Sequence, residues 1–517
     1  MPQQTVNGIV GAPTGYWFGR DVNSAAIVTV NGTAEIVYTL TDGSFMRLPG
    51  SGFTFSGTSG TNGVVLTGGT ITGLTRTDAT GATIYETVTA VSYAATTFQS
   101  HLAETDLQGI ASEIFAGADT FNGSAFNDFF RAFGGNDTIN GGGGNDTVSY
   151  QAPTMIGPIT VTLGTGAGAP SNSGGLVTAG VGSTGIGTDT LSSIELIIGT
   201  SAADTFTANA NFLGSDGSNF NDFEGRGGDD VINGNGNTRL SFGNSFATGL
   251  PNGTAGATVT FTNSVANANG SGTSTGSGLG TDTFSGVYQL RGSQYNDTIT
   301  ATGASQAAFG NDANAFFFDG RGGNDTFNGG GVADGPAGNA SLRYDANRAR
   351  YDNDSGSITA TLGTSNTVGA ATTSGGTVVA GVGGSAGNDT LNFVEQIRGT
   401  SSADTFTAFA NFRGLFGAFN EFEGAAGNDT IAGNGETRVG YTQATAGVTV
   451  TWAATATNAF TGAGTATGNA SVGTDTFVSG VNSVRGSSFA DTFTATGAHG
   501  FFGCRGNAGD DTVHGGA

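Results

Sequence analysis

The 517-residue sequence contains no lysine, a single cysteine, only 8 prolines and no apolar run long enough to cross a bilayer. The lone Cys504 excludes a disulfide within the chain. All 16 basic residues are arginine, and 40 acidic residues give a formal net charge of -24. Because such a chain repels phosphate backbones and anionic membrane surfaces, we expect neither nucleic-acid binding nor membrane insertion.

Glycine, by contrast, is abundant. The chain has 94 glycines, 36% hydrophobic residues and only 11% charged residues. A disordered chain usually carries more charge and fewer apolar residues than this. The composition therefore predicts an ordered architecture that tolerates glycine.

A nine-residue repeat is visible between residues 113 and 150. Four aspartates follow one another at intervals of nine residues, namely Asp119, Asp128, Asp137 and Asp146. Each is followed two positions later by an apolar residue, as in Asp146 and Val148. This regular pairing of a Gly/Asn/Asp turn with a short inward-facing strand predicts a solenoid and not a linker.

A longer cycle follows the nonapeptides. A GGNDT-like centre recurs at intervals of 84, 95, 104 and 82 residues, at Asp146, Asp230, Asp325, Asp429 and Asp511. Alternating segments at 159–163, 257–261, 358–362 and 448–452 come after the centres and predict half-buried strands. The glycine- and serine-rich runs 166–175 and 267–278 are interpreted as surface loops.

Each long cycle also contains a pair of Asp-Thr dipeptides. The aspartates of a pair are fifteen residues apart at Asp189/Asp204, Asp282/Asp297 and Asp389/Asp404, and sixteen apart at Asp475/Asp491. The additional residue in the last pair predicts a β-bulge.

The domain plan has three parts. Residues 1–95 contain several short strands with turn signals, which predict a small β-rich N-terminal domain. Apolar residues at 98, 102, 107, 110 and 114 predict a short helical cap over 96–115 that covers the first rung. Residues 116–517 then form the solenoid, with about four long cycles, and we expect many of the 37 phenylalanines to stack inside it.

Stacking of the aspartates calls for a cation. If nine residues make half a coil, Asp119 lies over Asp137 and Asp128 over Asp146, with rungs roughly 4.8 Å apart. At an effective dielectric constant of about 20, two such carboxylates repel by on the order of 3 kcal/mol. A cation between two such turns would attract both carboxylates and so hold the rungs together. Hard oxygen ligands in flexible glycine turns favour Ca²⁺ over Mg²⁺, and three histidines and one cysteine are too few for zinc or copper clusters.

Residues 141–149, GGGGNDTVS, resemble the nonapeptide GGxGxDxUx of the hemolysin-type, or RTX, calcium-binding proteins. The resemblance implies an all-β fold, a right-handed parallel β-roll or β-helix solenoid, in which the sixth-position Asp and turn carbonyls bind multiple calcium ions between rungs. Carried over by position, it implies the following metal-site residues: Asp119, Asp128, Asp137, Asp146, Asn136, Asn145, Gly135, Gly144, Asp229, Asp230, Asn324, Asp325, Asp334, Asn428, Asp429, Asp510 and Asp511. The Asp-Thr dipeptides add Asp204, Asp297, Asp404 and Asp491 as candidate ligands, with turns that need no metal as the alternative.

The sequence departs from the repeat pattern at three positions. Phe126 replaces the turn glycine that should precede Asp128. Arg239 and Arg438 stand nine residues beyond Asp230 and Asp429, so those two arrays are expected to break after one turn.

The sequence predicts no enzyme. It has no HExxH motif, and its two GxSxG matches, 272–276 and 383–387, fall in low-complexity runs. The histidines His101, His499 and His514 are isolated from one another, and the repeats account for most of the carboxylates.

Two non-enzymatic functions remain. The first is a secreted, calcium-stabilised structural protein that assembles with itself, end to end or side by side, into an extracellular filament, sheet or surface layer; its last repeat ends at Ala517 without a cap. The alternative is the repeat portion of a longer RTX adhesin, or the calcium module of a secreted enzyme. Cell-surface glycans are a further candidate partner.

We expect an extracellular or cell-surface location. Residues 1–18 lack the basic start and apolar segment of a signal peptide, so export is expected to be type I-like. The chain would stay extended at low cytosolic calcium and would coil in millimolar calcium outside the cell.

Overall fold

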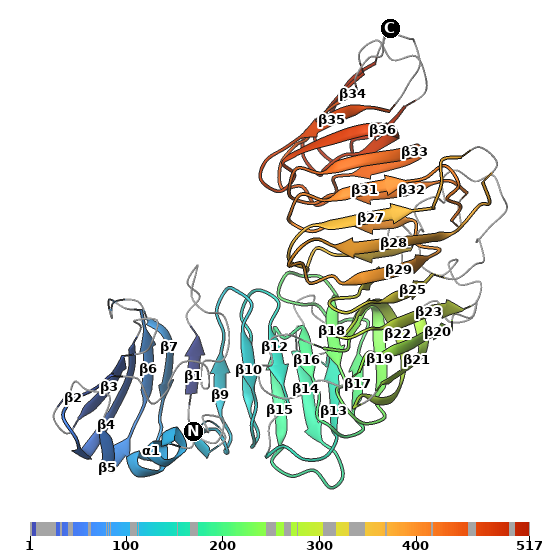
Figure 1. Ribbon diagram of the computed structural model, residues 1–517. Coiled ribbons are helices and arrows are strands. Elements are labelled where there is room, and N and C mark those ends of the chain that lie inside the picture. The colour runs from blue at the N-terminus through green and yellow to red at the C-terminus, as the bar shows by residue number, and fades with distance from the viewer. Residues whose placement is uncertain are drawn as a thin grey trace. The chain divides into compact units, whose positions relative to one another are not determined.

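The computed structural model of the protein is built almost entirely of β-strands (Figure 1). It describes residues 3–6, 27–31, 34–39, 45–59, 64–78, 80, 82, 84–103, 111, 113–151, 154–165, 174–243, 255–262, 270–276, 278–302, 317–329, 347–367, 370–414, 417–452, 462–495 and 502–515. The chain forms two compact units, unit 1 (Met1–Arg239 with Ser245–Thr248) and unit 2 (Leu240–Asn244 with Gly249–Ala517). The predicted ligand Asp334 lies outside the described residues.

Unit 1 begins with an antiparallel sheet and one helix. The elements are β1 (Gln3–Val6), β2 (Ile27–Asn31), β3 (Glu35–Thr39), β4 (Phe45–Ser56), β5 (Val65–Ile71), β6 (Leu74–Thr77), β7 (Ile84–Thr89), β8 (Tyr93–Ala94) and α1 (Ala95–Ala103). The strands pair in the order β2-β3-β4-β6-β7-β1, while β5 pairs with β4 and β8. β1 also pairs in parallel with the first solenoid strand, β9, and so joins the sheet to the solenoid.

The helix α1 packs on the N-terminal sheet. Phe98 of α1 is buried, with its ring centroid 6.0 Å from that of Tyr38 in β3. The backbone N–H of Leu66 in β5 donates a hydrogen bond to Gln99. Phe115, the last residue of the predicted cap, is buried with its ring centroid 5.1 Å from that of Phe121 in the first rung.

The rest of unit 1 is a solenoid of stacked parallel strands. Its elements are β9 (Thr120–Asn122), β10 (Phe129–Arg131), β11 (Thr138–Asn140), β12 (Thr147–Ser149), β13 (Ile159–Leu163), β14 (Gly174–Ala179), β15 (Thr188–Ser192), β16 (Leu196–Ile198), β17 (Thr205–Ala208), β18 (Asn221–Glu224) and β19 (Val231–Ser241). The parallel ladders are β9-β11-β15, β10-β12-β16-β18 and β13-β17-β19. Thr120 lies opposite Thr138 and Phe129 opposite Thr147, which confirms the predicted stacking of residues eighteen apart.

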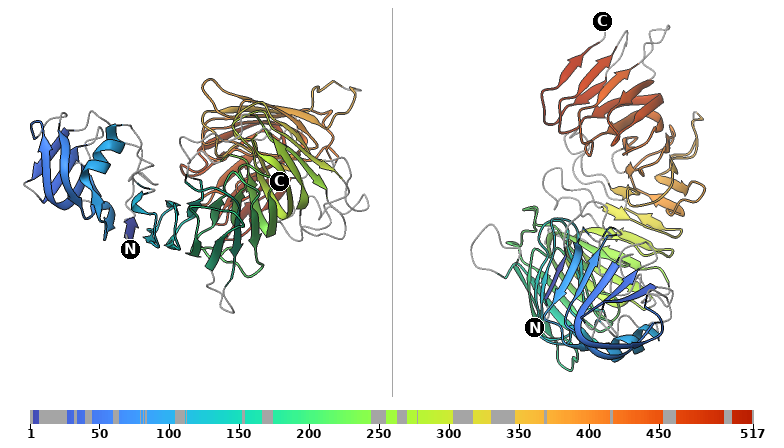
Figure 2. Two further views of the ribbon diagram at one scale, coloured as in Figure 1. Left: turned by 90° about the horizontal axis from the view of Figure 1, so that it is seen from below. Right: turned by 90° about the vertical axis from the view of Figure 1, so that its left-hand side faces the viewer.

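Unit 2 repeats this arrangement. Its elements are β20 (Thr258–Thr262), β21 (Gly270–Gly276), β22 (Gly280–Arg291), β23 (Thr298–Thr302), β24 (Phe317–Asp319), β25 (Thr326–Asn328), β26 (Arg348–Arg350), β27 (Ile358–Leu362), β28 (Gly375–Ala380), β29 (Asn388–Asn392), β30 (Gln396–Arg398), β31 (Thr405–Ala408), β32 (Asn420–Glu423), β33 (Thr430–Gly440), β34 (Thr449–Trp452), β35 (Gly464–Thr467), β36 (Thr474–Arg485), β37 (Thr492–Ala495), β38 (Gly503–Arg505) and β39 (Thr512–His514). Parallel ladders include β20-β23-β25-β29, β22-β24-β26-β30-β32 and β34-β37-β39. In both views of Figure 2 the strands of each unit cross the stack like rungs.

Antiparallel strands interrupt the parallel pattern. β14 lies between β13 and β15, β21 between β20 and β22, β28 between β27 and β29, and β35 between β34 and β36. The interpretation of 267–278 as a surface loop is therefore wrong, because this run contains β21. A Cβ at Gly272 would collide with the carbonyl of Thr260 and the ring of Phe284. Glycine serves here for close packing between strands and not for a loop.

Phenylalanine fills the core, as predicted. Three buried pairs have ring centroids 5.1 Å apart: Phe206–Phe223, Phe318–Phe327 and Phe406–Phe422. The bulge predicted between Asp475 and Asp491 is also confirmed. Ile431 and Ala432 of β33 lie opposite Phe477 and Ser479 of β36, so Val478 is the additional residue.

Arg239 and Arg438 occupy the positions where the aspartate arrays were expected to break. Arg239 forms an ion pair with Asp222 at 2.7 Å and lies 5.0 Å from the centroid of the Phe220 ring. Arg438 likewise pairs with Glu421 and lies over the ring of Phe419. An ion pair with an aromatic contact replaces the aspartate turn at these positions.

We expect Phe406→Ala to lower the free energy of unfolding of the calcium-loaded protein by about 3–5 kcal/mol, because it opens a cavity in a fully buried stack. Val382→Ala is the control, since the Val382 side chain is fully exposed. Urea unfolding followed by circular dichroism measures both. A Phe406→Ala protein as stable as the control would contradict the packing described.

Candidate metal centre

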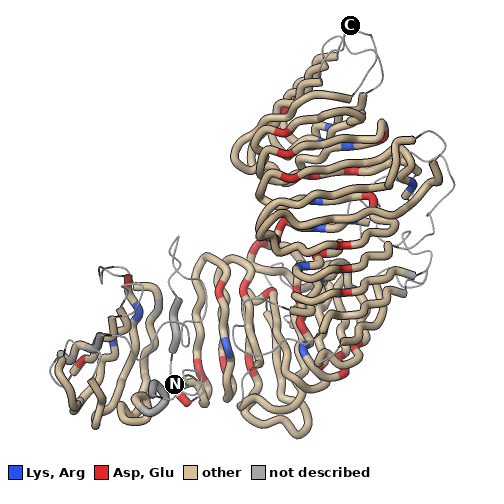
Figure 3. The backbone as a smooth tube through the Cα atoms, in the orientation of Figure 1, with Lys and Arg blue, Asp and Glu red and all other residues tan. Residues whose placement is uncertain are grey.

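Aspartates at the ends of the turns form ladders with the backbone of neighbouring rungs. The N–H of Asp119 donates to Oδ1 of Asp137 at 2.8 Å, and the N–H of Asp137 donates to Oδ1 of Asp189 at 2.9 Å. In unit 2, Asp297 donates to Asp325 and Asp325 to Asp389, both at 2.8 Å. The same bond joins Asp128 to Asp146, Asp204 to Asp230, Asp404 to Asp429 and Asp491 to Asp511. Figure 3 shows acidic residues recurring from rung to rung within each unit.

The second carboxylate oxygen, Oδ2, distinguishes the turns. We call the turns that end at Asp137, Asp146, Asp325 and Asp429 the centre turns. In each of them Oδ2 is buried and accepts no hydrogen bond from any described residue. The exposed fraction of these four side chains is 2% or less. A buried carboxylate oxygen without a partner is costly, so each centre turn lacks one positive or hydrogen-bonding group.

A second set, the Ser/Thr turns, satisfies Oδ2 from within. Oδ2 of Asp204 accepts the N–H of Thr200 at 2.7 Å, and the Thr200 hydroxyl donates to Oδ1 at 2.9 Å. The same two bonds join Ser293 to Asp297, Thr400 to Asp404 and Ser487 to Asp491. At Asp128, preceded by Phe126 in place of glycine, Oδ2 accepts the N–H of Ser124 at 2.6 Å.

A third set of aspartates is capped by a distant hydroxyl group. Oδ2 of Asp189, Asp389 and Asp475 accepts the hydroxyl of Tyr150, Tyr351 and Tyr441 at 2.9, 2.8 and 2.9 Å. Ser274 does the same for Asp282 at 2.8 Å. Sequence reasoning missed these tyrosines. Their signal is a tyrosine two positions after a buried strand residue, as in Val148 and Tyr150.

Centre turns also have a backbone shape of their own. In the turn before Asp146, Gly142 and Gly144 have φ angles of 92° and 108°, and before Asp325 the corresponding Arg321 and Gly323 have 68° and 111°. Among the described residues of the Ser/Thr turns, the corresponding positions lack positive φ. Two left-handed residues in alternation change which way the turn carbonyls face.

Glycine also leaves a hollow beside Oδ2. A Cβ at Gly141 would overlap Oδ2 of Asp146, and a Cβ at Gly320 would overlap Oδ2 of Asp325. The same holds for Gly424 and Asp429. The same hollow lies beside Oδ2 in the Ser/Thr turns, at Gly199, Gly292, Gly399 and Gly486, so both kinds of turn share it.

The electrostatics agree with this division. Burial, together with the charge of Asp189, raises the pKa of Asp137 to about 9, and burial with the charge of Asp389 raises that of Asp325 to about 9. Burial also raises the pKa of Asp146 to about 8. In the Ser/Thr turns, burial raises the pKa of Asp204 to about 7 and that of Asp297 and Asp404 to about 6. The rise is smaller because hydrogen bonds from the backbone of the neighbouring rung, and then from the Ser or Thr of the turn, stabilise the charged form.

The remaining predicted site residues form hydrogen bonds between rungs, shape the turns, or differ in their exposure to solvent. Oδ1 of Asn136, Asn324 and Asn428 accepts the N–H of Thr188, Asn388 and Thr474 in the next rung, and Asn145 donates its N–H to Asn127. Gly135 and Gly144 both have a φ of 108°. Asp229, Asp510 and Asp511 are exposed, whereas Asp119 and Asp230 are buried in the ladders.

These features fit a hard cation. The available donors are carboxylate and carbonyl oxygens, which calcium prefers, and the orphaned Oδ2 is a ready ligand. Within the described ranges, no three His, Cys, Asp or Glu side chains converge on a common point where they could hold a metal. A calcium ion at a centre turn would thus depend on backbone carbonyls for its other protein ligands.

Parallel ladders with side chains stacked in rows define the class of β-solenoid repeat proteins. The model of the RTX calcium-binding nonapeptide repeat matches the chain in 4 copies, over residues 114–148, 417–436 and 505–517. The chain therefore contains RTX-type calcium-binding repeats, and such repeats bind calcium at multiple sites. The centre turn at Asp325 has the same geometry although it lies outside the matched residues. No curated protein sequence matches the chain.

The raised pKa values predict an inverted pH dependence for the calcium-free protein. Asp137, Asp146 and Asp325 have folded pKa values of about 8 to 9, above the unfolded value of about 4. The folded chain thus holds these protons more tightly, so its stability is greatest below pH 4 and falls as pH rises through 8 to 9. Urea unfolding in chelator at several pH values measures this. Excess calcium should flatten the fall, and rising stability with pH in chelator would contradict it.

Proposed function

We propose that this protein is a secreted structural protein whose centre turns bind calcium, and which self-assembles into an extracellular filament, sheet or surface layer. The observation that carries the proposal is the row of buried Oδ2 atoms without hydrogen-bond partners. RTX repeats are typical of secreted proteins, and in the described part of the chain no helix is long and apolar enough to span a membrane. Type I-like export is part of the proposal.

Calcium would bind at the aspartates of the centre turns. Oδ1 of each is already engaged with the backbone of the preceding rung, so Oδ2 is the oxygen left for the ion, with turn carbonyls completing the site. The ion supplies positive charge that keeps a buried carboxylate ionised. Asp204, Asp297, Asp404 and Asp491 were also predicted as ligands. Their Oδ2 atoms are engaged by Ser or Thr, so we assign them the weaker sites, or a purely structural role.

The last described rung leaves one core position open. β38 and β39 pair with β36 and β37, and Val513 of β39 lies opposite Phe493. Phe493 is fully buried, whereas 57% of Val513 is exposed. A position that inner rungs bury is thus open, and a further rung would cover it, whether from the same chain or from another copy. Calcium would also neutralise part of the -24 charge that keeps copies apart.

The open rung fits the alternative function equally well, since in a longer adhesin or secreted enzyme the next rung would come from the same polypeptide. Assembly of the 517-residue chain by itself separates the two functions. We therefore test the calcium sites and the assembly with different variants.

We expect Asp325→Asn to lower the number of calcium ions bound per chain by about one. The amide keeps an oxygen for the N–H of Asp297 but lacks the charge that binds the ion. The matched control is Asp297→Asn, which changes the neighbouring carboxylate whose Oδ2 Ser293 already engages. Isothermal titration and metal analysis of dialysed protein give the counts. Equal counts for Asp325→Asn and the unchanged chain would refute the assignment.

With calcium restored after chelation, electron microscopy should show fibres or lattices, and sedimentation should show large species. Val513→Asp should block them, because it places a charge on the open rung. Val181→Asp is the control, since it adds the same charge at a fully exposed position. Monodisperse monomers of the unchanged chain at high concentration in calcium would rule out self-assembly while leaving the calcium count intact.

A further inference from the structure

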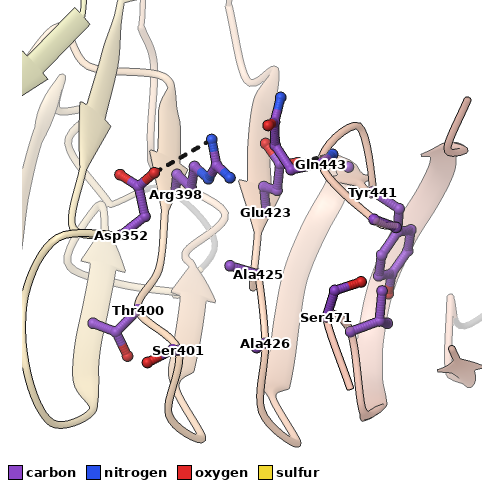
Figure 4. Close-up of a pocket in the computed structure, with 13 residues that line it drawn as sticks. Asp352, Arg398, Thr400, Ser401, Glu423, Ala425, Ala426, Tyr441, Gln443 and Ser471 are labelled. Carbon is purple, nitrogen blue, oxygen red and sulfur yellow. Dashed lines mark hydrogen bonds and ion pairs between the residues drawn. The ribbon is translucent and has the colours of Figure 1, made fainter. Parts of the chain in front are cut away.

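A cavity of about 180 Å³ opens beside one centre turn of unit 2 (Figure 4). Its polar residues come from successive rungs: Asp352, Arg398 and Glu423 lie in one row, with Gln443 next to Glu423. Ala425 of the centre turn lies below Glu423. Glu423 is buried, while Gln443 is exposed. The cavity therefore reaches from the surface down to a buried carboxylate.

The corresponding turn of unit 1 shows why the space is vacant. There, Arg226 stands where unit 2 has Ala425, and its guanidinium donates to Glu224 at 2.9 Å and also bonds Gln151. Arg226 is 7% exposed, so its side chain fills the space beside the strand. Ala425 has the same left-handed backbone, with φ of 68° against 76° for Arg226. The turn is thus conserved in shape within the chain, but the side chain that fills it is missing.

Charges within the cavity are balanced by arginines of the same unit. Arg350 donates two hydrogen bonds to Asp352, at 3.0 and 2.6 Å, and Arg398 lies 3.5 Å from it. Burial raises the pKa of Asp352, but the hydrogen bonds and charge of Arg350 outweigh it and hold that pKa below its usual value. Glu423 has Arg348 at 3.6 Å. The cavity therefore does not call for a charged ligand.

Two buried atoms of the lining residues nevertheless lack hydrogen bonds. Nε of Arg398 is a donor and Oε2 of Glu423 an acceptor, and neither has a hydrogen-bond partner among the described residues. The ion pair of Oε2 with Arg348 is longer than a hydrogen bond. One unsatisfied donor and one unsatisfied acceptor are complementary to hydroxyl groups, each of which donates and accepts.

The remaining lining has the same mixed character. Ser401 adds a hydroxyl group, while Ala426, Ala444 and Val472 add apolar surface. At about 180 Å³, the cavity has room for several waters or for one sugar ring. Polar groups around a small apolar wall match a ring with C–H faces and hydroxyl edges.

We propose that this cavity binds one hexose unit, as a free sugar or as the terminal residue of a glycan. Arg398, Glu423 and Gln443 would contact its hydroxyl groups, and Ala425 makes room for its ring. The side chains that line this cavity are not those assigned to calcium, so the proposal extends the protein's role from self-contact to contact with carbohydrate.

The test uses the full chain in calcium with methyl α-glucoside, α-galactoside and α-mannoside as probes, followed by saturation-transfer NMR and calorimetry. Ala425→Arg should weaken binding of the preferred hexoside by at least about tenfold, because it restores the side chain that fills the space in unit 1. Asn507→Arg is the matched control: it adds the same charge at the same position of another turn, where φ is 73°. Circular dichroism and melting confirm that both variants fold.

Each outcome decides the proposal. Binding that Ala425→Arg abolishes and Asn507→Arg leaves within about twofold supports it. Tighter binding of a glycan ending in the preferred hexose than of the methyl hexoside identifies a glycan terminus, whereas equal binding identifies the single sugar unit. The proposal is overturned if no hexoside binds, if Ala425→Arg binds as well as the control, or if only methylguanidine binds as a replacement for the missing arginine side chain.

Discussion

The structure depends on a carboxylate placed at the end of a turn and buried between rungs. One oxygen accepts a backbone N–H from the neighbouring rung, which fixes the register of the stack. The other oxygen needs a partner of its own, because a charged group with an unsatisfied oxygen is too costly to bury. In the proposed function, the partner that each turn provides for this second oxygen determines whether the rung needs calcium.

The protein meets the need in three ways. Ser/Thr turns use a hydroxyl and a backbone N–H four residues away, and a third set uses a tyrosine or serine hydroxyl from another rung. The centre turns leave the oxygen open and hold two left-handed residues before the carboxylate. Along the ladders, turns whose Oδ2 the protein satisfies thus lie next to turns whose Oδ2 it leaves open, as Asp297 lies next to Asp325. In the proposed function, calcium dependence is thereby confined to particular rungs.

The sequence was informative where the chemistry is local. The nine-residue spacing predicted the stacking of Asp119 on Asp137 because turn and strand lie within one repeat. The Ser/Thr turns could also have been recognised, since Thr200 and Asp204 are four residues apart. The bond from Tyr150 to Asp189 could not, because it depends on which rung follows after a hairpin of variable length. The glycine-rich runs were ambiguous for the same reason. The run that forms β21 has the composition of a loop, and only its pairing with β20 and β22 identifies it as a strand.

The most direct test of the account is a calcium anomalous-difference map of crystals grown in calcium. We predict peaks within bonding distance of Oδ2 at Asp146, Asp325 and Asp429, and weak or no peaks beside Asp204, Asp297 and Asp404, whose Oδ2 atoms the protein already engages. Peaks of equal height at both kinds of turn, or none at the centre turns, would contradict the claim that an unsatisfied carboxylate oxygen determines where the ion binds.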